Sequence, residues 1–152
     1  MAAREHNIRV VIRGSGCDFI GRSNAPNSLS ISTRNIKGDI TFNEKSFRPR
    51  GCKFNIPGPS ITAGGGSQMV ELYATTAKFN QTIVGAGGDT VGLGGFITGG
   101  GHGLLAARYG LAADNVLEME VVTPGGEVVV ANECQNQDIF WAMRGVSINS
   151  SD

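Results

Sequence analysis

The chain has 152 residues, with 13 basic and 13 acidic side chains and therefore a formal net charge of zero. This length suits one domain with a substantial core, and the balanced charge gives no electrostatic footprint for nucleic acid or an anionic membrane. The sequence has no apolar run of the ~20 residues that a membrane-spanning helix needs, and its first nine residues lack the apolar region of a secretory signal. We therefore expect no nucleic-acid or membrane partner, while the localisation stays open.

The first half of the chain predicts short strands separated by loops. Ala2–His6 resembles the end of a helix, and the β-branched run Ile8–Ile12 predicts a buried strand. Arg13–Asn27 is rich in small and turn-forming residues and predicts a loop. Further strands are expected to be half-buried at Leu29–Ile31, weak at Asp39–Phe42 and short at Lys53–Ile56.

The second half mixes helices and strands. Ser67–Asn80 is the strongest helix prediction, with Ser67 as its cap and Glu71 near the positive end of its dipole. The later elements are predicted in the order strand Thr82–Val84, helical turns Gly103–Arg108 ended by Gly110, strand Val116–Val122, turn Pro124–Gly126, strand Glu127–Ala131 and amphipathic helix Asp138–Arg144. Because this order has no regular βαβ rhythm, it indicates an α+β domain.

Glycine is the informative residue type. The chain has 23 glycines, and ten of the 19 residues from Gly85 to Gly103 are glycine, against a usual level of about 7%. Apolar residues such as Phe96 are interleaved with them, which favours a packed loop over a flexible linker. Glycine allows backbone N–H groups to approach a ligand closely, and successive N–H groups suit a pyrophosphate. The alternative is a set of tight turns at a sheet corner.

Two other phosphate-binding motifs fit the sequence less well. Gly101–Ala106 fits G-x-G-x-x-A, and Glu118 and Glu120 lie where a Rossmann fold places its ribose-binding acid. However, Phe96–Gly100 precedes the motif in place of a longer buried strand, so a nicotinamide-binding module is the weaker interpretation. No GK[ST] sequence occurs, which excludes a P-loop.

A second small-residue loop, Arg13–Ser23, follows the first predicted strand and has an arginine near each end. It is able to offer N–H groups and positive charge to a phosphate, although an ordinary connecting loop explains the same residues. His102 lies in the glycine cluster, either lining a ligand site or making a structural hydrogen bond. For Asp114 and Asn115, turn formation is the simpler interpretation.

The three cysteines, Cys17, Cys52 and Cys134, are widely spaced and odd in number. They form no CxxC pair, so we expect neither a zinc site nor a thioredoxin-type motif, and no metal. A disulfide framework is not expected, and reduced thiols are the simpler interpretation.

The two loops and their spacing resemble the PCMH-type FAD-binding domain of the vanillyl-alcohol oxidase superfamily, and within it the berberine-bridge-enzyme-like FAD-linked oxidoreductases of fungi. The resemblance runs from about Ala3 to Gly145 and is carried by three segments: Arg13–Ser23, Thr90–Asn115 (TVGLGGFITGGGHGLLAARYGLAADN) and Val121–Gly145 (VVTPGGEVVVANECQNQDIFWAMRG). It implies an α+β domain that binds FAD, with hydride transfer from a substrate to flavin and oxygen as the usual electron acceptor.

The resemblance also implies a contact set. The first loop would wrap the pyrophosphate, through Arg13, Gly14, Ser15, Gly16, Cys17, Asp18, Gly21, Arg22 and Ser23. The second would approach the flavin and the rest of the dinucleotide, through Thr90, Gly92, Gly95, Gly99, Gly100, Gly101, His102 and Gly103, with Asp114, Asn115 and Val116 behind it. No catalytic residue is assigned.

Three departures qualify the resemblance. Relatives with covalent flavin carry a histidine where this chain has Cys17, and those with a bicovalent flavin also carry a cysteine where it has Gly88, so we expect FAD to be bound non-covalently. The sequence also diverges after Gly145, which predicts a partial FAD-binding domain over residues 1–145 and a divergent tail over 146–152. The start of the domain and the substrate domain are expected to be missing. The alternative is a non-catalytic truncated remnant with weak or no flavin binding.

Overall fold

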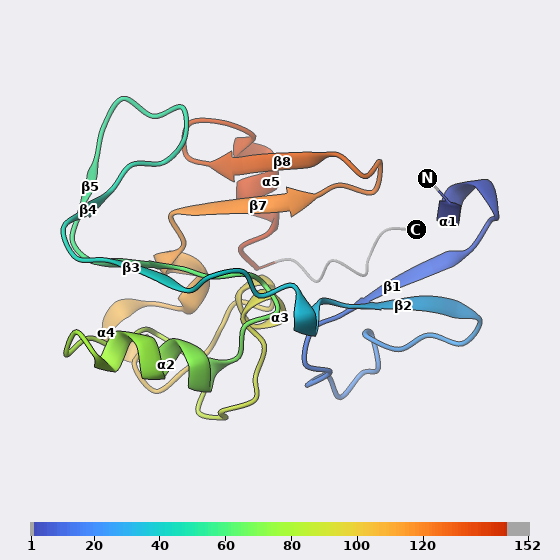
Figure 1. Ribbon diagram of the computed structural model, residues 1–152, viewed down its shortest axis with the longest axis horizontal. Helices are drawn as coiled ribbons and strands as arrows, with labels where there is room; N and C mark the ends of the chain where they lie inside the picture. The colour runs from blue at the N-terminus through green and yellow to red at the C-terminus, as the bar shows by residue number, and fades with distance from the viewer. Residues whose placement is uncertain (1, 146–152) are drawn as a thin grey trace.

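The computed structural model describes residues 2–145, and the tail expected at 146–152 lies outside the described residues. Figure 1 shows three regions: a ribbon formed by β1 and β2, a central region containing β3, α2 and α3, and a hairpin of β7 and β8 with α5 beside it. Helices and short strands are mixed along the chain without a βαβ repeat, which confirms the α+β prediction. Within the described part, no helix has the length and apolar character needed to cross a bilayer.

The N-terminal ribbon consists of one parallel strand pair after a short helix, α1 (Ala2–Glu5). β1 (Arg9–Arg13) pairs with β2 (Ser28–Ser32), so that Val10 lies opposite Leu29 and Ile12 opposite Ile31. The predicted positions of both strands are confirmed, but their predicted burial is wrong. Only Val11 is buried, because the described part of the chain packs no further element over the face that carries the other branched side chains.

Two small antiparallel pairs follow a 3-10 turn, η1 (Thr33–Asn35). β3 (Thr41–Asn43) pairs with β6 (Ser60–Thr62), and β4 (Ser46–Phe47) pairs with β5 (Ile56–Pro57). The strand expected at Lys53–Ile56 therefore begins only at its last residue. Neither β4 nor β6 was predicted, since two or three residues carry too little periodicity to be recognised.

The core lies around α2 (Met69–Ala77). Met69 and Leu72 are fully buried, and with Ala86 they form a cluster against which β6, Tyr73 and α3 pack. The helix prediction is confirmed, but its N-cap is Gln68 rather than Ser67, whose backbone carbonyl instead accepts a hydrogen bond from Leu93. The strand predicted at Thr82–Val84 is wrong: these residues form an irregular segment that contributes Ile83 to the core.

The glycine-rich segment is more regular than predicted. It contains α3 (Leu93–Thr98), a short helix where the sequence predicts a loop, because two of its six residues are glycine. α4 (Ala106–Tyr109) follows, and Gly110 ends it as expected. A 3-10 turn, η2 (Ala112–Asn115), then packs against α3.

The C-terminal unit agrees closely with the prediction. β7 (Glu118–Val122) and β8 (Val128–Asn132) form an antiparallel hairpin around the Pro124–Gly126 turn. α5 (Gln137–Ala142) lies against β8 and buries Phe140.

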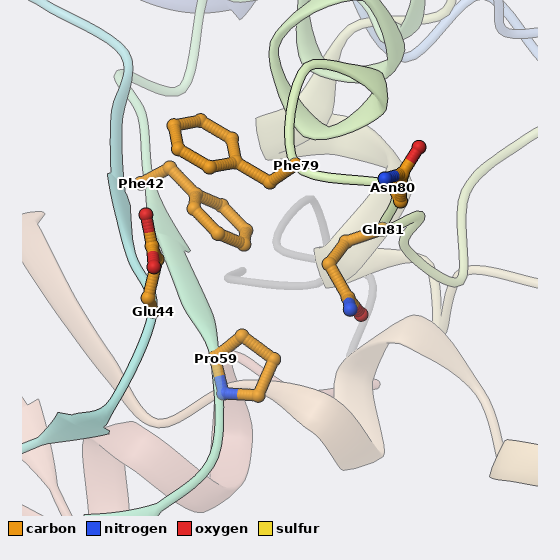
Figure 2. Close-up of a pocket in the computed structure, with 6 residues that line it drawn as sticks. All are labelled: Phe42, Glu44, Pro59, Phe79, Asn80 and Gln81. Atoms are coloured by element: carbon orange, nitrogen blue, oxygen red, sulfur yellow. The ribbon is translucent and has the colours of Figure 1, made fainter.

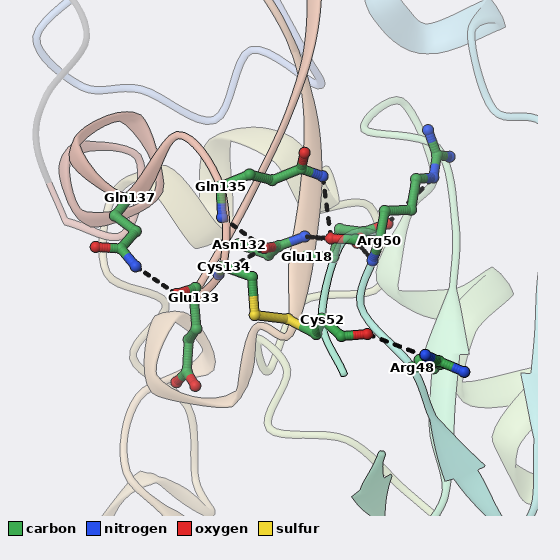
Figure 3. The surroundings of a disulfide bond; sticks show 9 residues. All are labelled: Arg48, Arg50, Cys52, Glu118, Asn132, Glu133, Cys134, Gln135 and Gln137. Carbon is green, nitrogen blue, oxygen red and sulfur yellow. Dashed lines mark hydrogen bonds and ion pairs between the residues drawn. A yellow bond between two sulfur atoms is a disulfide. The ribbon is translucent and has the colours of Figure 1, made fainter. Parts of the chain in front are cut away.

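A disulfide joins this C-terminal unit to the central region. Cys52, in the β4–β5 connection, is bonded to Cys134, between β8 and α5, with 5.5 Å between the Cα atoms. Figure 3 shows that Asn132 and Gln135 both donate side-chain hydrogen bonds to the Arg50 carbonyl beside it. The expectation of reduced thiols is therefore wrong for this pair, because sequence spacing does not reveal which residues the fold brings together; only Cys17 is free.

Candidate functional site

The first loop, Arg13–Ser23, leaves the end of β1 and is closed by an internal ion pair. The Asp18 carboxylate accepts hydrogen bonds from the backbone N–H of Arg22 and from its guanidinium, with Nη2 2.9 Å from Oδ1. The Arg22 side-chain hydrogen bond lowers the pKa of Asp18 below its usual value. Asp18 and Arg22 therefore help to fix the shape of the loop, whichever ligand it meets.

The second loop is fixed to the start of α2 by backbone hydrogen bonds. Leu93 N–H donates to the Ser67 carbonyl at 2.8 Å, Gly94 N–H to the Gly65 carbonyl at 3.0 Å, and Met69 N–H to the Val91 carbonyl at 3.1 Å. The Gln68 side chain also donates to the carbonyl of Thr90. This part of the glycine cluster is thus positioned by the hydrophobic core rather than left flexible.

The segment Gly64–Gly66 belongs to the same region, and the sequence analysis missed it. A Cβ on Gly66 would lie 1.8 Å from the Thr33 carbonyl oxygen, so only glycine allows this close approach of two backbone segments. Ser67, next to it, is fully buried, and its hydroxyl has no partner among the described residues. Three consecutive glycines before a helix were the available signal.

The structure brings the two predicted loops together. The Gly92 N–H, at the start of α3, donates to the Ser15 hydroxyl oxygen at 3.0 Å across 77 residues of sequence. Figure 1 shows α3 beside the base of the β1–β2 ribbon, where the first loop begins. A longer hydrogen bond joins the base of the first loop to η1: the Thr33 hydroxyl donates to the Arg13 carbonyl at 3.4 Å.

Gly99–Gly103 and η2 form a second layer. The carbonyls of Gly100 and Gly101 accept hydrogen bonds from Ala113 and Ala112, and a Cβ on Gly103 would lie 2.1 Å from the Gly85 carbonyl oxygen. Packing within the chain therefore already requires glycine at Gly103.

The residues behind this layer have local roles. The Asp114 carboxylate accepts the Leu111 N–H, and the Asn115 amide donates to the Tyr109 and Leu111 carbonyls. These contacts agree with turn formation for both side chains. Val116 is half-buried, whereas His102 is exposed.

Two predicted site glycines have no such explanation within the chain. A Cβ on Gly14 or on Gly95 would meet no atom within 4 Å, and neither residue has a positive φ. Gly95 even lies inside α3, where alanine is the better helix former by about 1 kcal/mol. The Ser23 hydroxyl is buried and unpartnered among the described residues. One glycine in each loop is thus open to close approach by a ligand, and these features fit a dinucleotide.

Two hollows are found in the described part of the chain, and the second includes Asp114 of the predicted contact set. Figure 2 shows one in which the Phe42 and Phe79 rings stack, with 4.2 Å between their centroids, beside Glu44, Pro59 and Gln81. A second is lined by Asp114, Trp141, Arg144 and Gly145. The first hollow has no glycine-rich backbone and contains a carboxylate, so its chemistry does not suit a phosphate.

Comparisons with known proteins identify the family of this chain. The family described as FAD binding domain matches residues 1–132. The FAD-linked oxidoreductase easE of Arthroderma benhamiae is 47% identical over 145 residues, which is 94% of this chain. Among solved structures, the VAO-type flavoprotein MtVAO615 of Myceliophthora thermophila C1 aligns with a TM-score of 0.84 and 39% identity over 94% of this chain, and BBE-like 1 of Physcomitrella patens with a TM-score of 0.75 and 28% identity over 94%.

The chain spans 28% of the length of the Arthroderma relative, 25% of the Myceliophthora structure and 29% of the Physcomitrella structure. The match nevertheless includes both loops, the core around α2 and the β7–β8 hairpin. The chain therefore belongs to the FAD-binding domain family, in the form found in VAO-type and BBE-like flavoproteins.

Proposed function

We propose that this chain, through residues 1–145, forms the FAD-binding part of an FAD-linked oxidoreductase. The observation that carries the proposal is that Gly14 and Gly95, predicted contacts in different loops, have open space at their Cβ positions, as Gly87 of the second loop also does. Because the Ser15–Gly92 hydrogen bond joins these loops, one extended ligand is able to contact both. FAD, with a pyrophosphate between two ring systems, has that extended shape.

In this proposal each loop has its own task. The first loop offers backbone N–H groups and Arg13 to the pyrophosphate, while α3 and Gly99–Gly103 face the flavin end. FAD held there would supply the chemistry of accepting a hydride from a substrate, with oxygen as the proposed final electron acceptor. The residues of this chain bind and orient the cofactor, and substrate recognition depends on other parts of an intact enzyme.

We further propose that the cofactor is held without a covalent bond. Cys17 occupies the place of the histidine that the resemblance associates with covalent flavin, and its side chain is shorter than an imidazole. Cys17 is exposed, and the Asp18 carboxylate beside it is engaged by Arg22 rather than poised as a base. After acid precipitation we expect the yellow colour in the supernatant; colour retained in the pellet would contradict this part of the proposal.

A non-catalytic remnant with weak flavin binding is the second candidate, and one observation favours it. The first loop is supported by a two-stranded ribbon whose apolar side chains Val10, Ile12 and Ile31 are exposed. A loop on so small a support is less well preorganised, which lowers affinity. Hydrogen peroxide formed above the level of free FAD, with a panel of alcohols and sugars, would exclude this candidate.

The test uses alanine at the two open glycines. Gly14→Ala and Gly95→Ala fit the folded chain without collision, so we expect unchanged or slightly higher stability but an FAD affinity at least about tenfold lower. Gly125→Ala, in the β7–β8 turn, is the matched control because its Cβ would make only an ordinary contact with Thr123 at 3.6 Å. Flavin fluorescence titration measures the affinity. Wild-type FAD binding by both variants, or tighter binding of NAD than of FAD, would overturn the proposal.

A further inference from the structure

The first three N–H groups at the start of α3 are all used within the protein. A helix cannot satisfy its own first N–H groups, so they need partners from outside it. Leu93 and Gly94 donate to the carbonyls of Ser67 and Gly65, which lie in the segment that leads into α2. Gly92 donates instead to the Ser15 side chain, in the first loop. Ser15 is thus the residue through which the first loop reaches α3.

The geometry around Gly92 shows how closely the two loops meet. Gly92 is buried, and a Cβ on it would lie 3.2 Å from the Ser15 backbone nitrogen and 3.3 Å from the Ser15 hydroxyl oxygen. Gly92 is therefore glycine because Ser15 packs over it. Since its N–H is already bound to Ser15, Gly92 has no N–H left to offer a ligand.

We propose that Ser15 is a positioning residue, which sets the separation of the two loops by accepting the Gly92 hydrogen bond. The inference rests on the proposed function, because FAD is the ligand that would span both loops. In this proposal the Ser15 side chain acts through Gly92 and α3, in place of the direct FAD contact that the resemblance implies for Ser15. Loss of the hydroxyl should weaken only a ligand that contacts both loops at once.

The test compares Ser15→Ala with Ser15→Thr, which keeps the hydroxyl. Hydrogen exchange of the Gly92 amide should become about tenfold faster or more in Ser15→Ala, since a buried N–H loses its acceptor. The Leu93 amide is an internal control, because it donates to the Ser67 carbonyl and does not depend on Ser15. Unchanged Gly92 exchange, or equal acceleration at Leu93, would overturn the proposal.

Ligand binding supplies a readout that a merely structural role would not move. In Ser15→Ala we expect FAD affinity to fall about tenfold, while ADP, which reaches only the first loop, and riboflavin, which reaches only the second, change less than about twofold. Ser15→Thr should restore FAD binding. An equal loss for FAD and ADP would overturn the proposal by showing direct phosphate contact.

Failure of the proposed function is distinguishable from failure of this inference. If the wild-type chain binds no FAD, the proposed function fails, and the positioning role for FAD fails with it. The contact between the loops is then still decided by the Gly92 and Leu93 exchange rates in the free protein. If the wild type binds FAD and Ser15→Ala binds it equally well, only the positioning role is overturned.

Discussion

The β1–β2 ribbon and the region around α2 and α3 both carry a glycine-rich loop, but they support it differently. In the ribbon, Ile12 is 59% exposed and Leu29 51% exposed, whereas in the α2 region Met69 and Leu72 are fully buried. The second loop is therefore held in place by packing against the core. The first loop is held by two strands, an internal ion pair and the Ser15 hydrogen bond. Loops of similar composition thus differ in how firmly they are held.

Glycine also has two different structural roles, and both occur in the α2–α3 region. Gly66 and Gly103 each lie so close to another backbone segment that a Cβ would overlap a carbonyl oxygen. Gly14 and Gly95 have open space at their Cβ positions. Composition alone cannot separate a packing glycine from a ligand-facing one. The distance from each absent Cβ to its surroundings identifies the glycines that packing requires, and it leaves Gly14 and Gly95 as candidates for ligand contact.

The largest effect is expected at Gly66. In Gly66→Ala the Cβ would overlap the Thr33 carbonyl oxygen at 1.8 Å, which displaces the start of α2 and should cost ~5 kcal/mol or more in unfolding free energy. We expect loss of the cooperative thermal transition measured by circular dichroism. Gly87→Ala is the control, because its Cβ meets nothing within 4 Å. Equal stability of the two variants would show that glycine is not needed for this close approach.

Reduction of the disulfide should have the next largest effect. Cys52 and Cys134 are 82 residues apart in sequence, and the loop-entropy relation gives about 4.5 kcal/mol of stabilisation for a cross-link of that span. Urea denaturation with and without dithiothreitol measures the difference, and Cys52→Ser is expected to resemble the reduced protein. Cys17→Ser is the matched control and should leave the midpoint unchanged. A midpoint insensitive to reduction would contradict the prediction.

A smaller effect is expected at Glu71, which connects α2 to the segment before β3. Hydrogen bonding to Lys37 chiefly lowers the pKa of Glu71 below its ordinary value of 4.5, with the Gln68 N–H and Arg34 adding to the effect. A lowered folded-state pKa stabilises the protein above the unfolded-state pKa, and this stability is lost as the pH falls through the folded-state pKa.

Glu71→Gln should therefore cost ~1 kcal/mol at pH 7, because the pair is partly solvated, and the difference from wild type should shrink below pH 4. Urea denaturation across pH 3–7 measures it. A constant difference over that range would mean that Glu71 acts through packing and not through its charge.

The smallest effect is expected on the ribbon. Ile12→Thr should change the unfolding free energy by no more than ~0.5 kcal/mol, because 59% of Ile12 is exposed in the folded state. Leu72→Ala, in the core, should cost ~2–5 kcal/mol. Similar losses for the two variants would show that the ribbon is buried in solution, which would remove the contrast between the regions.

The sequence predicted the C-terminal unit best. The alternation in Val116–Val122 and the Pro124–Gly126 turn are local signals, and β7, β8 and their turn follow them. The placement of α2 was equally clear from its apolar face. Three features that were predicted wrongly depend on tertiary contacts. They are the exposure of Ile12, the irregular Thr82–Val84 segment and the Cys52–Cys134 bond.

In the candidate site, too, local features were predicted from the sequence and contacts between distant residues were not. The two loops were predicted from their glycines, and the family from the motifs they carry. The Ser15–Gly92 hydrogen bond and the close approach at Gly66 join residues distant in sequence, so no local pattern reveals them. The FAD contacts of individual residues stay predictions.

The disulfide also keeps the chain covalently connected after a single cleavage between Cys52 and Cys134. Cys52 and Cys134 lie on either side of the Pro124–Gly126 turn, so a protease that cleaves this turn leaves two pieces that remain covalently joined. The nicked protein would migrate as one band without a reducing agent and as two bands with one. The second glycine-rich loop and β7 would stay in the piece that carries Cys52, and the disulfide would keep β8 and α5 attached to that piece.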